Sequence, residues 1–143
     1  KENLEKIREE SRALMTEKVG VFRTEAGLIE AIETLKALKE RAANATLACK
    51  SLKMNPELIL RWELDNLLAI SIVTAMCALN RRESRGGHAR KDFPERKDDF
   101  NYHTLATMTE FAEVDLAKRA VDMSIFESKC EHYEKFGIIE RTY

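Results

Sequence analysis

The sequence predicts a mainly α-helical fold: a spectrin-repeat-like, antiparallel three-helix bundle, followed by an irregular charged loop and a small β-hairpin. Apolar residues recur at helical spacing through residues 1–83. Two adjacent glycines and a proline then interrupt the pattern, and from residue 102 apolar residues alternate with period two. With 143 residues the chain is expected to form a single domain. The bundle is placed at 1–83, the loop at 84–101 and the hairpin and tail at 102–143.

The first two helices are predicted from their apolar stripes. One runs from Lys1 to about Lys18, and Gly20 is expected to end it. The next begins at Thr24, whose side chain can cap free N–H groups, and runs to about Ala43. The residues expected to face the core are Leu4, Ile7, Leu14, Met15, Leu28, Ile32, Leu35 and Leu38.

The third helix has the clearest start in the chain. Asn55 can act as the cap, Pro56 suits the first helical position, and the helix is expected to run to about Glu83. The apolar run 67–79 is too short for a membrane span, so it indicates a core helix. Because this helix is apolar on two faces, it should lie between two others, with Trp62 as a packing residue. One face carries Leu58, Trp62, Leu68, Ile72, Met76 and Leu79, and the second carries Ile59, Ile70 and Val73.

The last part of the chain favours β-structure. Apolar and polar residues alternate in the segments 102–109, 114–118 and 121–125, which predicts an antiparallel hairpin packed on the helices. Residues 128–136 are expected to add one or two helical turns before Gly137.

Composition and cysteine usage exclude several classes of protein. The net charge is −1 and the pI about 6.4, so no sequence-wide basic field favours nucleic acid or a membrane surface. Cys49, Cys77 and Cys130 are odd in number and form no C-x-x-C pair, which argues against a disulfide framework or a structural zinc site. These features fit reduced, intracellular surroundings. Since the chain begins at Lys1 without a methionine, we expect it to be a fragment of a longer protein.

The charged loop is the candidate functional segment. Between Arg81 and Asp99, seven Lys or Arg residues accompany five Asp or Glu residues. We interpret the loop as internally paired and as a docking surface for a neighbouring domain. A direct part in substrate binding or in proton delivery by His88, and a solvated loop without a partner, remain alternatives. The predicted docking residues are Glu83, Ser84, Arg85, Gly86, Gly87, His88, Arg90, Asp92 and Arg96.

The loop also carries a family resemblance. Its E-S-R-G-G-H-A-R at 83–90, D-F-P-E-R at 92–96 and D-D at 98–99 resemble a signature late in the flavoprotein subunits of succinate dehydrogenase and fumarate reductase, with a related form in L-aspartate oxidase. V-G-V-F-R at 19–23, N-P-E-L at 55–58 and the E-R-T-Y ending resemble further segments of the same C-terminal domain, in the same order. Gly87 departs from the family, since many members carry alanine there, and residues 106–136 match poorly.

The resemblance implies the C-terminal helical domain of an FAD-dependent oxidoreductase subunit that interconverts succinate and fumarate. Its implied partners are the FAD-binding domain of the same subunit and an iron–sulfur subunit, with no nucleic acid. It further implies a cytoplasmic place, peripheral on the inner face of the cytoplasmic membrane and in contact with it only through partner subunits. FAD belongs to the full-length subunit: this chain has no G-x-G-x-x-G, so we expect no cofactor and no catalysis in the fragment alone. No catalytic, cofactor-binding or metal-ligating residue is assigned to it.

A second class of function remains open. The Arg81–Lys97 patch could serve a stand-alone helical adaptor or a nucleic-acid-binding module. Such modules show a clear basic excess, which the interspersed acids of the loop reduce.

Overall fold

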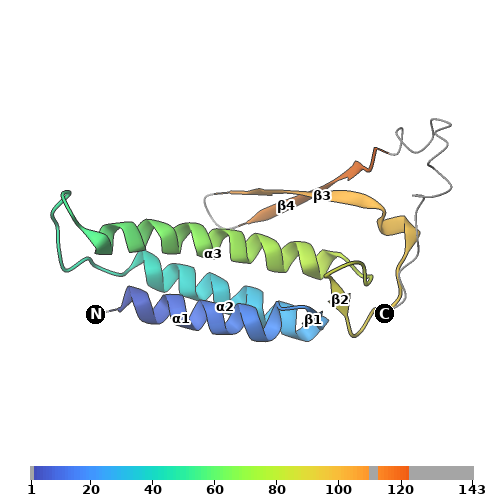
Figure 1. Ribbon diagram of the computed structural model, residues 1–143, viewed down its shortest axis with the longest axis horizontal. Coiled ribbons are helices and arrows are strands. Elements are labelled where there is room, and N and C mark those ends of the chain that lie inside the picture. Colours follow the sequence, from blue (N-terminus) through green and yellow to red (C-terminus); the bar gives the residue numbers. More distant parts are fainter. Residues whose placement is uncertain (1, 110–112, 123–143) are drawn as a thin grey trace, which may run out of the picture.

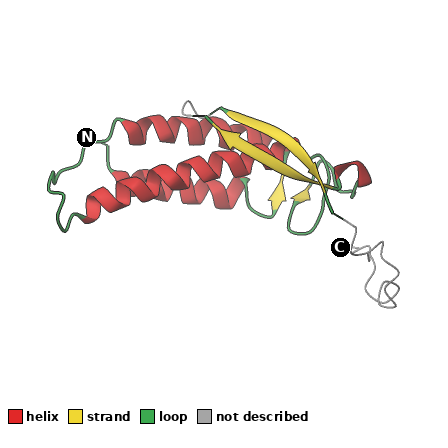
Figure 2. Ribbon diagram, turned by 90° about the horizontal axis from the view of Figure 1, so that it is seen from above, coloured by secondary structure: helices red, strands yellow, loops and turns green. Residues whose placement is uncertain are grey.

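The computed structural model describes residues 2–109 and 113–122, which form three α-helices, one short 3₁₀ helix (Asp98–Phe100) and two small sheets. The helices α1 (Leu4–Lys18), α2 (Glu25–Ala43) and α3 (Pro56–Asn80) lie side by side (Figure 1). The strands β3 (Tyr102–Met108) and β4 (Val114–Ala120) form a hairpin that lies over the helices (Figure 2). This confirms the mainly helical class with a small antiparallel hairpin.

Each helix begins at a polar cap that the sequence offers. The Asn3 Oδ1 accepts from the Glu5 N–H at 2.9 Å, and the Thr24 Oγ1 accepts from the Gly27 N–H at 3.2 Å. The Asn55 Oδ1 accepts from two N–H groups at 3.1 and 3.2 Å. These bonds satisfy helix-start donors that would otherwise lack partners. The predicted starts at Thr24 and Asn55 are confirmed, whereas the first helix begins at Leu4 and not at the predicted Lys1. The third helix ends at Asn80, before the predicted Glu83, because Arg81 has an extended backbone.

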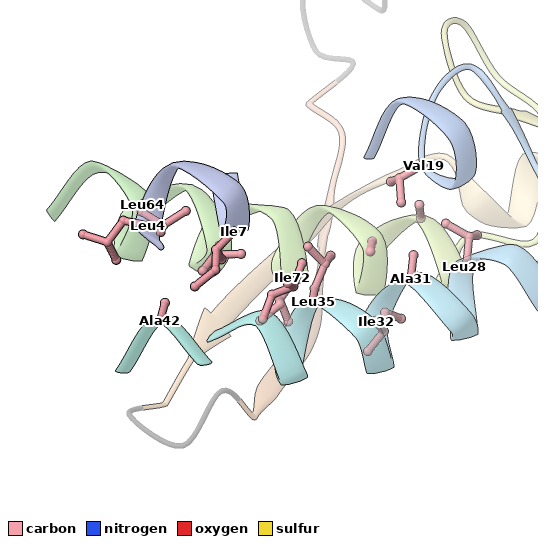
Figure 3. Close-up of a cluster of buried hydrophobic side chains, with 14 residues drawn as sticks. Leu4, Ile7, Val19, Leu28, Ala31, Ile32, Leu35, Ala42, Leu64 and Ile72 are labelled. Carbon is pink, nitrogen blue, oxygen red and sulfur yellow. The ribbon is translucent and has the colours of Figure 1, made fainter. Parts of the chain in front are cut away.

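One hydrophobic core is shared by the three helices (Figure 3). In α3 the buried residues include Leu64, Leu68 and Ile72, which recur every four residues and so form one stripe. Burying a side chain of this size contributes about 1.5–3 kcal/mol, so this stripe is a major stabilising element. The other buried core residues are Leu4, Ile7, Val19, Leu28, Ala31, Ile32, Leu35, Leu38, Ala42, Ala75 and Ala78.

Two parts of the prediction for α3 were wrong: Trp62 of the first face is not a buried packing residue, and the second face, with Ile59 and Ile70, is not buried between helices. Trp62 is 60% exposed, and Ile59 and Ile70 are exposed as well. Trp62 precedes the buried Leu64 by two residues, and residues at that spacing point to different sides of a helix. Instead of lying between two helices, α3 lies between the other helices and the hairpin, contacting β3 and β4 (Figure 1). By length and composition α3 could cross a membrane, but its stripe packs on α1 and α2 as in a core helix.

The hairpin pairs in one continuous register, from Tyr102 opposite Ala120 to Met108 opposite Val114. The alternation is confirmed, because Met108 and Val114 pack against the core while their neighbours are exposed. Residues 121 and 122 follow β4 without joining it. The remainder of the predicted segment 121–125, the helical turns at 128–136 and the tail lie outside the described residues.

A second, parallel sheet was not predicted. The strands β1 (Phe22–Arg23) and β2 (Ala89–Arg90) pair where α1 ends and α2 begins, with Phe22 opposite Ala89. The segment after Gly20 therefore joins the charged loop to the helices.

Candidate docking site

The charged loop that follows the end of α3, residues 83–99, forms an end loop of the domain. Its first feature is a tight turn at Arg85-Gly86-Gly87-His88. The Arg85 N–H donates to the His88 carbonyl at 2.8 Å, and the His88 N–H donates back at 3.0 Å. Gly86 has a φ of 58°, a backbone conformation that favours glycine. The glycine pair therefore makes this turn possible, with Gly86 at the demanding position.

Glu83 lies at the centre of the end loop and is fully buried. Its Oε1 accepts from the Arg81 Nη1 at 2.6 Å and from the Arg85 Nε at 2.9 Å. Its Oε2 accepts from the Lys97 N–H at 2.9 Å. Burial alone would raise the pKa of Glu83, but the bonds from Arg85, Lys97 and Arg81 outweigh it and lower that pKa. The carboxylate therefore stays charged and joins both ends of the loop.

Arg90 is also buried and connects the loop to two helix ends. Its Nη1 donates to the Ala78 and Leu79 carbonyls at the end of α3, at 3.1 and 3.2 Å. Its Nε and Nη2 donate to the Asp92 carboxylate, which accepts from the Glu25 N–H in the first turn of α2 at 2.8 Å. The Arg90 guanidinium holds the pKa of Asp92 well below its usual range. The anion position at the start of α2 is therefore filled by the protein's own carboxylate.

Ser84 is used for loop geometry. Its Oγ accepts from the Arg90 N–H at 2.8 Å and donates to the Phe93 carbonyl at 2.9 Å. The hydroxyl therefore joins residue 84 to residues 90 and 93 of the same loop. Neither partner is a base that could activate the hydroxyl. The arrangement agrees with a structural serine rather than a nucleophile.

His88 contacts Arg23 of β1 through one ring nitrogen. Since Arg23 can only donate, the His88 Nδ1 must accept from the Arg23 Nη1; since the Arg81 carbonyl can only accept, the Nε2 carries the hydrogen and donates to it at 3.1 Å. Burial, together with the nearby Arg23 and Arg90 cations, lowers the pKa of His88. The ring is therefore neutral at pH 7. It links the turn to β1 and to the end of α3.

Arg81 connects the end loop to the hairpin. Its Nη1 donates to the Phe100 carbonyl at 2.7 Å and its Nη2 to the Tyr102 carbonyl at 2.8 Å, in addition to the Glu83 bond. Arg81 and Arg23 are absent from the predicted docking residues. The sequence feature that could have pointed to both is a charged residue at the boundary of an element. Arg81 follows the last turn of α3, and Arg23 follows the apolar pair Val21-Phe22.

An open cavity of about 470 Å³ lies beside this network. Its polar lining includes Arg23, Arg81 and His88, and Val73, Cys77 and Ala78 of α3 form an apolar wall. The cavity therefore combines positive charge with an apolar surface.

The structure separates the predicted docking residues into two groups. Glu83, Ser84, Arg85, His88, Arg90 and Asp92 all bond within the domain, as does Arg96 with the exposed Asp98 at 3.1 Å. Gly86 and Gly87 are exposed at the tip of the turn. The exposed apolar residues near this end are Val21, at 56%, and Phe22, at 68%.

These residues do not fit a dinucleotide. A phosphate loop needs glycine N–H groups between a strand and the start of a helix. At the start of α2, the junction that follows β1, the Glu25 N–H is bonded to Asp92 and Thr24 caps the helix. Within residues 2–109 and 113–122, His, Cys, Asp and Glu form no cluster able to hold a metal ion.

Comparison with known proteins identifies the family. Residues 8–143 match the family model described as the fumarate reductase flavoprotein C-term. The chain is 41% identical over 122 residues to a succinate dehydrogenase flavoprotein subunit of Coxiella burnetii, covering 85% of this chain and 20% of that protein. It is 36% identical over 131 residues to a fumarate reductase flavoprotein subunit of Helicobacter pylori, covering 85% of this chain and 18% of that protein.

Two solved structures agree with these matches. One is E. coli quinol fumarate reductase FrdA, with a TM-score of 0.80 and 33% identity over 84% of this chain and 21% of that one. The other is the Mycobacterium smegmatis Sdh1 complex, with a TM-score of 0.77 and 32% identity over 83% of this chain and 20% of that one. The chain thus spans about a fifth of the length of the relatives it matches. It belongs to the family of C-terminal domains of succinate dehydrogenase and fumarate reductase flavoprotein subunits.

Proposed function

We propose that this chain is part of an oxidoreductase subunit that interconverts succinate and fumarate, with FAD held by another domain of that subunit. The relatives it matches are named as flavoprotein subunits of these enzymes. Electrons would pass through an iron–sulfur subunit, and the complex would lie on the cytoplasmic side of the membrane, held there by partner subunits. The role of this chain is structural support of the FAD-binding domain rather than chemistry.

We propose further that the end loop docks on the FAD-binding domain. The observation that carries this proposal is the contrast between its interior and its tip. Glu83 and Arg90 are buried and fix the loop from within, whereas Gly86, Gly87 and Phe22 remain exposed. A rigid surface loses little conformational entropy on binding, so such a surface suits a permanent domain interface.

The domain organisation forms part of the same proposal. Residues 1–143 would act as one unit, with an antiparallel, spectrin-repeat-like bundle as its body. The alternating course of the helices in Figure 1 and their shared core support this arrangement.

The adaptor or nucleic-acid-binding alternative is less well supported. The arginines of the patch pair with carboxylates: Arg81 and Arg85 with Glu83, Arg82 with Glu25, Arg90 with Asp92 and Arg96 with Asp98. Paired charges release few counterions on phosphate, so we expect weak binding with a shallow salt dependence. A steep loss of DNA or RNA affinity with rising salt would favour the alternative.

Hydrogen exchange tests the docking proposal. We expect the amides of residues 19–24 and 84–92 to exchange more slowly in the full-length subunit than in this chain alone, because the interface excludes water there. Residues 29–34, in the first half of α2, are the internal reference. Equal exchange of the end loop in the two proteins would contradict docking through it. Fumarate reduction by the full-length subunit, measured in parallel, tests the proposed activity.

A further inference from the structure

Arg23 is the one arginine of this network that the described residues leave without a carboxylate partner. Its Nε donates to the Val19 and Gly20 carbonyls at 3.1 and 2.6 Å, and its Nη1 contacts His88. The Nη2 group has no partner within residues 2–109 and 113–122. In contrast, Arg81 and Arg90 are each paired with an acid.

The surroundings of Arg23 raise the free energy of its charge. Burial and the nearby Arg90 cation lower the pKa of Arg23, so no local anion stabilises its positive charge. Arg23 is half-buried, and a guanidinium partly removed from water without a counter-charge is destabilised, for which proteins commonly compensate with a carboxylate. Arg81 cannot bind that carboxylate in place of Arg23, because the Arg81 guanidinium already donates to Glu83 and to two backbone carbonyls.

A carboxylate from outside the domain could reach Arg23 through the cavity that lies beside it. Arg23 and His88 both line this cavity, together with Val73 and Cys77 of α3. An acidic side chain could reach the guanidinium here while its CH₂ groups contact the apolar wall. Planar guanidinium groups bind carboxylates through two parallel N–H bonds, which favours an anion of this shape.

We propose that Arg23 is the receptor for an aspartate or glutamate side chain of the FAD-binding domain of the same subunit. This inference rests on the proposed function and names the partner of the docking site. A free dicarboxylate has the same chemistry but could not cover Val21 and Phe22, which precede Arg23 and are exposed. A protein surface can cover both residues and supply the carboxylate together.

Carbodiimide coupling in the full-length subunit tests the proposal, because this reagent joins amines to carboxylates in direct contact. The subunit carries Arg23→Lys, and the cross-linked peptides are identified by mass spectrometry. We expect position 23 to couple to an Asp or Glu outside this domain. Lys18 is the positive control, because its Nζ lies 3.1 Å from the Glu30 Oε2 within the domain. If Lys18 couples to Glu30 while position 23 couples only within this domain, or not at all, the proposal is overturned.

A measurement on the unmodified subunit covers the case in which Arg23→Lys does not fold. An arginine-specific dicarbonyl reagent should label Arg12, which is exposed on α1, but should not label Arg23. Equal labelling of the two would overturn the proposal. Protection of Arg23 that requires added succinate would also overturn it, in favour of a free dicarboxylate.

The two proposals fail in different ways. Slow exchange at residues 84–92 without a cross-link at position 23 would retain the docking proposal and reject the acidic partner. Fast exchange at those residues would reject docking itself.

Discussion

The Arg90 guanidinium donates to both carboxylate oxygens of Asp92, at 2.8 and 2.7 Å, and this pair joins two helix ends. Arg90 donates to carbonyls at the end of α3, where a cation is favoured, and Asp92 accepts from the first turn of α2, where an anion is favoured. The pair is therefore stabilised by each helix as well as by its own two bonds. It explains why a loop rich in both charges is ordered against the helices.

The core prediction concerns two neighbouring leucines of α3. Leu68 is fully buried and Leu67 is 42% exposed, so the two residues share a helix but not an environment. Leu68→Ala should lower the free energy of unfolding by roughly 2–5 kcal/mol, as buried large-to-small changes do. Leu67→Ala should cost less than about 1 kcal/mol, since little buried area is lost. Urea denaturation measures both. Similar costs would mean that the buried stripe of α3 is placed wrongly.

The turn prediction concerns the two adjacent glycines. At Gly86 the φ of 58° disfavours any side chain, so Gly86→Ala should destabilise the domain by about 1–2 kcal/mol. A Cβ at Gly87 would meet no atom within 4 Å, and Gly87 is outside the positive-φ region. Gly87→Ala should therefore be nearly neutral, in accord with the alanine of many family members. Thermal unfolding of the two variants tests this, and a larger loss for Gly87→Ala would contradict the turn geometry.

A structural feature could be predicted from the sequence when the residues that form it lie close together in the chain. The starts of α2 and α3 were predictable, because Thr24 and Asn55 bond to N–H groups two or three residues away. The hairpin was predictable for a similar reason, since alternation is local in the chain. The pairing of β1 with β2 was not, because Phe22 and Ala89 are distant in sequence and each strand has two residues.

Trp62 shows a second limit. Its size and its place in an apolar helix favour burial, yet it is 60% exposed. When apolar residues occupy two faces of a helix, periodicity cannot decide which face meets the core. In the charged loop, composition indicated pairing but could not show that Glu83 would be the buried centre or that Arg23 would reach His88.

Glu83 gives the third prediction. Glu83→Gln keeps the volume but removes the charge that Arg81 and Arg85 share, so it should cost about 3–5 kcal/mol, as breaking a buried ion pair does. The matched control is Asp98→Asn, because the Arg96–Asp98 pair is exposed and should contribute about 0–1 kcal/mol. Chemical denaturation at pH 7 compares the two. Equal effects would show that Glu83 is not the centre of the network.

The Glu83 carboxylate should also make the stability of the domain sensitive to acid. Because the folded-state pKa of Glu83 is lowered, its contribution is present above the unfolded value of about 4 and is lost as the pH falls below it. The stability of Glu83→Gln should therefore fall less between pH 5 and pH 3 than that of the wild-type chain. These pH limits follow from the unfolded value of about 4.

His88 gives the last prediction, in a separate pH range. Its folded-state pKa is lowered, so its contribution to stability is present above the unfolded value of about 6.5 and is lost as the pH falls through the folded value. The cause is local: a protonated Nδ1 could no longer accept from Arg23, and it would add a third charge beside Arg23 and Arg90. His88→Gln should therefore weaken the fall in urea midpoint between about pH 7 and pH 5. His103→Gln, at an exposed position of β3, is the control and should keep the wild-type slope. If the slope instead survives in His88→Gln, the Arg23–His88 contact cannot be what couples stability to pH in this range.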